Sequence, residues 1–81
     1  MPYPLVELYS KDDCHLCDDV KDVLLNVRKR VPFQLVEVKI MEGMEEFERF
    51  RERIPVVYID KRFAFQRRIT EAEFLKILQD R

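Results

Sequence analysis

The chain has 81 residues, of which 47% are hydrophobic and 38% charged, a balance typical of one globular domain. Its 15 basic and 16 acidic side chains nearly cancel and leave a formal net charge of −1. Such a balance provides no strong field for nucleic acid or a membrane surface, and no apolar run is long enough to cross a bilayer. The sequence therefore predicts a single domain over residues 1–81 with no nucleic-acid partner and no membrane association.

Both cysteines of the chain lie within residues 13–17, D-C-H-L-C. A secreted disulfide scaffold of this size would carry more cysteines. A structural zinc site needs four ligands, whereas Cys14, Cys17 and the single histidine, His15, crowd on one turn. The first residues show no basic segment followed by an apolar run, as a signal peptide would. We therefore expect a cytoplasmic protein with a redox cysteine pair and no bound metal.

The motif lies between an expected strand and an expected helix. Residues 5–9, L-V-E-L-Y, have the pattern of a buried strand. A polar loop follows, in which Asp13 is a suitable helix N-cap, and residues 14–30 predict a helix with one apolar stripe. Because Cys17 lies on this stripe and Cys14 lies at the helix tip, we expect Cys17 to face the core and Cys14 to face solvent. The stripe consists of Leu16, Cys17, Val20, Val23, Leu24 and Val27.

The rest of the chain completes an alternating pattern of strands and helices. Asp60 and Lys61 form a tight turn that makes the last two strands a hairpin, and Thr70 and Glu73 have the spacing of a capping box. The first two strands flank a crossover helix and are expected to be parallel. The order is therefore βαβαββα, an α/β fold. The expected elements after the first helix are strands over 33–40, 54–59 and 62–65, a helix over 44–53, and a helix that follows the capping box.

Two thiols three positions apart at a strand-to-helix junction favour thiol–disulfide chemistry. Residues i and i+3 share one helix face with Cβ atoms about 5–6 Å apart, close enough for a disulfide after a modest rearrangement. The free N–H groups and the dipole at a helix N-terminus stabilise a thiolate. Cysteines in C-x-x-C motifs accordingly have a thiol pKa below the usual value of about 8.5. We interpret Cys14 as the nucleophile and Cys17 as the cysteine that resolves the mixed disulfide.

Two segments of the chain resemble the glutaredoxins. Residues 9–17, Y-S-K-D-D-C-H-L-C, look like the start of that family, and residues 54–59, I-P-V-V-Y-I, look like the segment that holds its cis-proline. The resemblance covers almost the whole chain and implies a thioredoxin-like, glutaredoxin-type fold with a four-stranded mixed sheet flanked by helices. The chain has His15-Leu16 where glutaredoxins commonly have Pro-Tyr, and residues 65–68, F-Q-R-R, where they usually have Gly-Gly. It thereby resembles small glutaredoxin-like proteins with C-H-L-C-type sites.

The resemblance implies roles for further residues around the cysteines. Lys11 matches a lysine that lies near the thiolate and contacts a glutathione carboxylate. A cis Ile54–Pro55 bond would leave the backbone of Ile54 free to pair with an extended substrate. A protonated His15 favours the thiolate, and Arg67 can hold an anionic group such as a glutathione carboxylate. The alternative interpretations are a loop lysine, an exposed histidine and a solvated arginine.

The sequence thus predicts a thiol–disulfide oxidoreductase of the glutaredoxin type, which reduces protein disulfides or glutathione mixed disulfides. We expect a monomer with no bound cofactor, for which glutathione can serve as co-substrate. One alternative is an iron–sulfur module in which two subunits share a cluster and glutathione supplies further ligands. Another is a non-catalytic interaction domain built on a redox fold.

Overall fold

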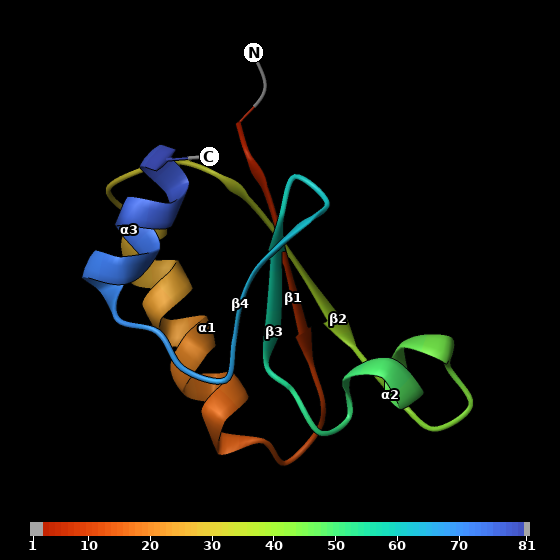
Figure 1. Ribbon diagram of the computed structural model, residues 1–81. Helices are drawn as coiled ribbons and strands as arrows, with labels where there is room; N and C mark the ends of the chain where they lie inside the picture. Colours follow the sequence, from red (N-terminus) through yellow and green to blue (C-terminus); the bar gives the residue numbers. More distant parts are fainter. Residues whose placement is uncertain (1–2, 81) are drawn as a thin grey trace.

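The computed structural model of the chain describes residues 3–80 and places four strands and three helices there in the order βαβαββα (Figure 1). This is the order predicted from the sequence. The helix ends differ most from the prediction, because both α1 and α2 end earlier than their apolar and charged patterns indicate. The elements are β1 (Leu5–Ser10), α1 (His15–Arg28), β2 (Gln34–Lys39), α2 (Glu45–Phe50), β3 (Val56–Ile59), β4 (Arg62–Gln66) and α3 (Glu71–Asp80).

The four strands form one mixed sheet in the order β2-β1-β3-β4. As expected, β1 and β2 are parallel, while β3 is antiparallel to both β1 and β4. The register pairs Tyr9 with Val56 and Ser10 with Lys39. The carboxyl end of β1, from which the chain passes to α1, therefore lies beside the start of β3. The cysteine motif follows β1 and therefore lies at this edge of the sheet.

The main core lies between the sheet and the helices α1 and α3, which Figure 1 shows on the same side of the sheet. Along β1 the side chains alternate, and Val6 and Leu8 on the helix side are fully buried. Each fully buried side chain of this kind contributes about 1.5–3 kcal/mol of transfer free energy, so this core holds α1 against the sheet. The cluster consists of Val6, Leu8, Val20, Leu24, Val27, Phe33, Val57, Ile59, Phe65, Phe74 and Leu78.

A second, smaller apolar cluster surrounds the cysteine pair. Its buried members come from three parts of the chain that are far apart in sequence, and α2 joins it through Phe50. Cys14 and Tyr9 are partly buried and pack against this cluster. The cluster therefore anchors the start of α1, the end of α2 and the start of β3 at one place. Its buried members are Cys17, Ile40, Phe50, Ile54 and Val56.

The helix predicted over 44–53 is shorter in the structure, where α2 ends at Phe50. The amides of Arg53 and Ile54 both donate to the carbonyl of Phe50, at 2.8 and 3.0 Å, which closes the helix in a turn. The physical reason is Pro55, because a residue before proline is pushed out of the helical region. This turn brings Ile54 into the apolar cluster.

The predicted hairpin turn is confirmed. Asp60 and Lys61 have φ angles of 50° and 69°, and a two-residue hairpin turn of type I′ requires positive φ at both positions. The Asp60 carboxylate also accepts a hydrogen bond of 2.9 Å from the amide of Leu5.

Within residues 3–80, none of the helices combines the length and the apolar character of a membrane span.

The capping box at the start of α3 gives the first prediction. The amide of Glu73 donates to Thr70 Oγ1 at 3.1 Å, and the amide of Thr70 donates to Glu73 Oε1 at 2.9 Å. We expect Thr70→Ala to lower the free energy of unfolding by about 1 kcal/mol in denaturant titrations, because it leaves helix amides unpaired. Thr70→Ser keeps the hydroxyl and is the matched control. Equal stability of the two variants would contradict a stabilising box.

Candidate active site

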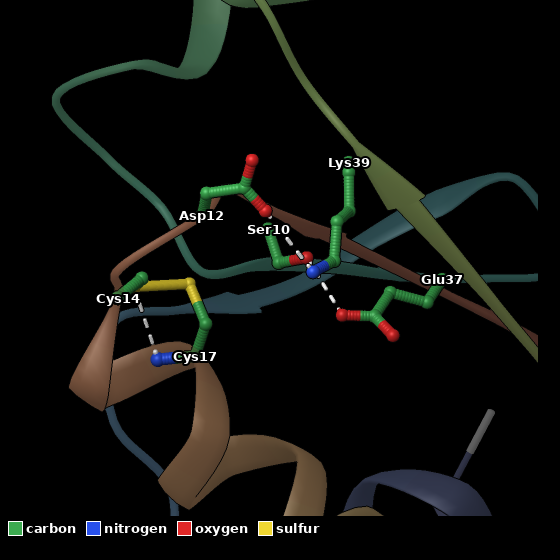
Figure 2. The surroundings of a disulfide bond; sticks show 6 residues. All are labelled: Ser10, Asp12, Cys14, Cys17, Glu37 and Lys39. Atoms are coloured by element: carbon green, nitrogen blue, oxygen red, sulfur yellow. Dashed lines mark hydrogen bonds and ion pairs between the residues drawn. A yellow bond between two sulfur atoms is a disulfide. The ribbon is translucent and has the colours of Figure 1, made fainter.

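Cys14 and Cys17 form a disulfide at the start of α1, with their Cα atoms 5.2 Å apart (Figure 2). Cys14 is the N-cap residue, with extended backbone angles, and its sulfur accepts a hydrogen bond of 3.1 Å from the amide of Cys17. The prediction of Asp13 as the N-cap is wrong. Asp13 has a φ of 56°, so the chain turns through the left-handed region there and the helix begins one residue later.

The two cysteines differ in burial, as the apolar stripe predicted. The Cys17 residue is 3% exposed, whereas Cys14 is only partly buried. The cause is the orientation of α1, which turns the face that carries Cys17 and Val20 toward the sheet. The pair therefore combines a partly exposed cysteine with a buried one.

The segment before β3 lies close to the cysteine pair. Ile54 and Cys17 belong to the same buried cluster, against which Cys14 packs. The Ile54–Pro55 peptide bond is cis, which confirms that prediction. Both Ile54 and Pro55 are buried, and the carbonyl of Pro55 accepts a hydrogen bond of 2.7 Å from the amide of Arg67. The structure thus brings together the motif, the cis-proline segment and the end of β4.

The predicted cationic residues lie on the surface around this centre. Lys11 is exposed in the loop between β1 and α1, and His15 is the exposed first residue of α1. Arg67 is also exposed and has a φ of 74°, a backbone region that glycine favours. Its guanidinium donates to the carbonyl of Glu52 at 3.2 Å, so it bridges the turn after α2 and the end of β4. Their roles in substrate binding stay predictions.

A partly buried polar network that joins β1, β2 and α1 was not foreseen from the sequence. Ser10 is 1% exposed and is the one buried polar residue within the described residues 3–80. Its hydroxyl donates to Glu37 Oε2 at 2.8 Å, and Lys21 Nζ donates to Glu37 Oε1 at 2.9 Å. In Figure 2 the Ser10 side chain lies between the disulfide and Glu37. A glutamate between two valines in a strand is the signal that could have indicated this network.

The network sets the charge of the carboxylate. The hydrogen bond from Lys21 lowers the pKa of Glu37 from its ordinary value of 4.5. The hydrogen bond from Ser10 also lowers this pKa, whereas partial burial raises it. An exposed ion pair of 3.2 Å joins Lys39 to Asp12 nearby, and this contact raises the pKa of Lys39. It connects the loop before Cys14 to β2. The site therefore holds Glu37 as a carboxylate at neutral pH.

The topology, the cysteine pair at a helix N-terminus and the adjacent cis-proline define a protein of the thioredoxin-like fold class. Solved structures share the fold. A structural genomics target protein from X. campestris (XcR50) has a TM-score of 0.81 at 22% identity, covering 94% of this chain and 97% of its own. Protein Ne2328 from Nitrosomonas europaea has a TM-score of 0.79 at 17% identity, and the match covers 94% of this chain and 92% of that protein. A protein of unknown function from Staphylococcus aureus (SA0789) has a TM-score of 0.74 at 14% identity, and the match covers 99% of this chain and 92% of that protein.

The family follows from the sequence match. Residues 5–79 match the family described as the Glutaredoxin-like domain (DUF836), and the chain belongs to that family. The match includes both cysteines and the cis-proline segment, on which the resemblance to glutaredoxins was based. The predicted family and fold are thereby confirmed.

The lowered pKa of Glu37 predicts how stability depends on pH. A carboxylate whose pKa is lower in the native state stabilises the fold above its unfolded pKa, and this contribution is lost as the pH falls through the native pKa. We expect Glu37→Gln to lower the free energy of unfolding by roughly 1 kcal/mol at neutral pH. The difference from wild type should shrink as the pH falls below 4.5. Denaturant titrations over a pH series measure it, and a difference independent of pH would contradict the assignment.

Proposed function

We propose that this protein is a thiol–disulfide oxidoreductase, with Cys14 as the nucleophile and Cys17 as the resolving cysteine. The observation that carries the proposal is the unequal exposure of a C-x-x-C pair at the N-terminus of α1. Cys14 is partly exposed and Cys17 is buried behind it. Membership of the glutaredoxin-like family supports the same chemistry. An inert structural disulfide has no need of an accessible sulfur at a helix end that favours a thiolate.

The reaction follows from the two positions. In the reduced protein the Cys14 thiolate attacks one sulfur of a substrate disulfide, forms a mixed disulfide and releases the other sulfur as a thiolate. Cys17 then attacks the Cys14 sulfur, which releases the second substrate thiolate and forms the disulfide seen in the structure. Two electrons pass from the cysteine pair to the substrate. The helix amides at the N-terminus of α1 favour the thiolate form of Cys14.

The residues around the pair suggest how a substrate is held. The carbonyl of Ile54 pairs with an extended segment of a protein substrate, because the amide of Ile54 already donates to the carbonyl of Phe50. Lys11 and Arg67 bind a carboxylate of a glutathione mixed disulfide. Glutathione is the co-substrate that reduces the Cys14–Cys17 disulfide, and no cofactor is bound. The protein acts as a monomer in the cytoplasm, where thiol reductants keep such disulfides transient.

The roles of the two cysteines are separable by substitution. Cys14→Ser should abolish reduction of an insulin or small-molecule disulfide, because the remaining cysteine, Cys17, is buried. Cys17→Ser should accumulate a mixed disulfide on Cys14, since resolution is removed, and intact mass spectrometry detects this adduct. Full dithiol activity in Cys14→Ser would rule out the proposed nucleophile.

The role of glutathione is tested by a redox titration in glutathione buffers, with the species separated by intact mass. We expect a reversible internal disulfide with a potential of roughly −200 to −270 mV, and a glutathione adduct along the way. Lys11→Gln should lower the adduct fraction, because it removes a cation beside the motif. Lys29→Gln, at the other end of α1, is the matched control. Thiols that stay reduced across the range would exclude an oxidoreductase.

A further inference from the structure

The face of the sheet opposite α1 and α3 carries a row of aromatic side chains. Because Leu8 of β1 points into the core under these helices (Figure 1), Glu7 and Tyr9 point to the other face. The register pairs Tyr58 of β3 with Glu7 and with Phe63 of β4, and directly paired residues share a face. Strands β1, β3 and β4 therefore present aromatic rings on the face that α1 and α3 leave uncovered.

These rings form one connected group with the end of α2. The Phe50 ring lies 4.9 Å from that of Tyr9 and 6.1 Å from that of Tyr58, measured between centroids. Tyr58 in turn lies 6.1 Å from Phe63. Since α2 has only six residues, it does not cover the whole group. Phe50 is 2% exposed, whereas Phe63 is 51% exposed.

Two arginines lie over the same rings. The guanidinium carbon of Arg49 is 4.9 Å from the centroid of Phe50. That of Arg53 is 5.5 Å from Phe50 and 5.9 Å from Phe63. A guanidinium that stacks on a ring keeps its N–H edge available for a carboxylate. The rings and the two cations make up a surface that we call the arginine–aromatic surface: Tyr9, Phe50, Tyr58, Phe63, Arg49 and Arg53.

The arginines of this surface lack a carboxylate. Among residues 3–80, neither Arg49 nor Arg53 takes part in an ion pair. Arg53 donates through Nε to Gln66 Oε1 at 2.9 Å, which leaves its Nη groups for another acceptor. Glu7, on the same face, is already paired with Lys61 at 3.1 Å. The two guanidinium groups are therefore available to an anionic group from another molecule.

Tyr9 adds a neutral donor to the surface. Burial raises the pKa of its phenol, and so does the charge of Glu7, so the hydroxyl keeps its proton at neutral pH. A protonated phenol can donate a hydrogen bond to a carboxylate. Glu46 of α2 also raises this pKa and opposes an anionic ligand. Its single charge is outweighed by those of Arg49 and Arg53, so the surface as a whole favours an anion.

The arginine–aromatic surface adjoins the cysteine pair. Tyr9, Tyr58 and Cys14 all pack against the buried cluster that contains Cys17 and Phe50. From β1 to β4 there are two strand spacings, or about 10 Å. An extended peptide spans at most about 3.5 Å per residue. A peptide of a few residues that begins at Cys14 can therefore cross this face of the sheet.

We propose that the arginine–aromatic surface binds an acidic, extended segment of a protein substrate while Cys14 attacks the disulfide beside that segment. The proposal rests on the proposed function and deepens it by naming the class of protein that the site selects. Charge complementarity argues for this occupant, because such a segment supplies the carboxylates that the two guanidinium groups lack. Arginine and tyrosine are also residue types on which binding energy at protein interfaces concentrates.

The test measures how fast the reduced protein releases thionitrobenzoate from two synthetic peptides. Each peptide carries thionitrobenzoate on one cysteine, beside a run of glutamates in the first and of lysines in the second, and its rate with dithiothreitol corrects for intrinsic reactivity. We expect the glutamate peptide to react about tenfold faster at low salt, and Arg49→Gln/Arg53→Gln to abolish this preference. Lys29→Gln/Arg30→Gln removes the same charge at the other end of α1 and is the matched control.

Two further rates separate contact from long-range attraction and from damage to the site. Phe63→Ser removes no charge and should slow the glutamate peptide several-fold. Leu25→Ser, at a 37% exposed position on α1, should leave that rate unchanged. With bis(2-hydroxyethyl) disulfide, which is uncharged, every variant should react as wild type does. Equal rates of wild type and Arg49→Gln/Arg53→Gln on the glutamate peptide, or an equal loss on the uncharged disulfide, would overturn the proposal.

Binding without reaction is followed by NMR of the reduced wild-type protein with a glutamate peptide that has serine in place of its cysteine. Amide shifts in α2, β3 and β4 that Arg49→Gln/Arg53→Gln abolishes would support the proposal. If oligothymidylate shifts these amides and the peptide does not, the surface binds nucleic acid and the proposal is wrong. Release of no thionitrobenzoate from either peptide by wild type would overturn the proposed function, and these shifts still decide whether the surface binds the acidic segment.

Discussion

The hydrogen bond from the Cys17 amide to the Cys14 sulfur is the contact on which the site depends. It makes the cysteine sulfur the N-cap of α1, so the start of the helix and the position of the reactive atom are set by one interaction. The apolar face of α1 then packs on the sheet and turns Cys17 inward. The partial exposure of Cys14 and the burial of Cys17 are therefore consequences of where this helix begins.

The fold was predictable because each level of the sequence indicates the same structure. The apolar stripe of α1, the alternation in β1 and the capping box at Thr70 are local patterns that the core satisfies. The hairpin turn at Asp60 and Lys61 needed no glycine, since aspartate and lysine adopt the positive φ angles. Recognition of the C-x-x-C motif and the Ile-Pro segment then supplied the cysteine pair and the cis bond, which local pattern alone leaves undecided.

The unpredicted parts depend on contacts between distant residues. The partners of Glu37 lie 27 and 16 positions away, at Ser10 and Lys21, and no local pattern states which strand end meets which helix turn. The N-cap was misplaced by one residue because Asp13 is the better capping residue by type, whereas its left-handed backbone excludes it. The end of α2 was misplaced because helix-forming charged residues continue to Arg53, whereas Pro55 keeps Ile54 out of the helical region and the chain leaves the helix in a turn after Phe50.

The sequence separation of the disulfide has a consequence for the stability of the two redox forms. A bridge between residues 14 and 17 closes a loop with a separation of only 3, and the entropy that a cross-link removes from the unfolded chain decreases as the loop becomes shorter. Two apolar clusters that need no covalent bond hold the helices and the sheet. The bridge therefore contributes less to stability than one that closes a longer loop, and the two apolar clusters supply contacts that do not depend on its oxidation state.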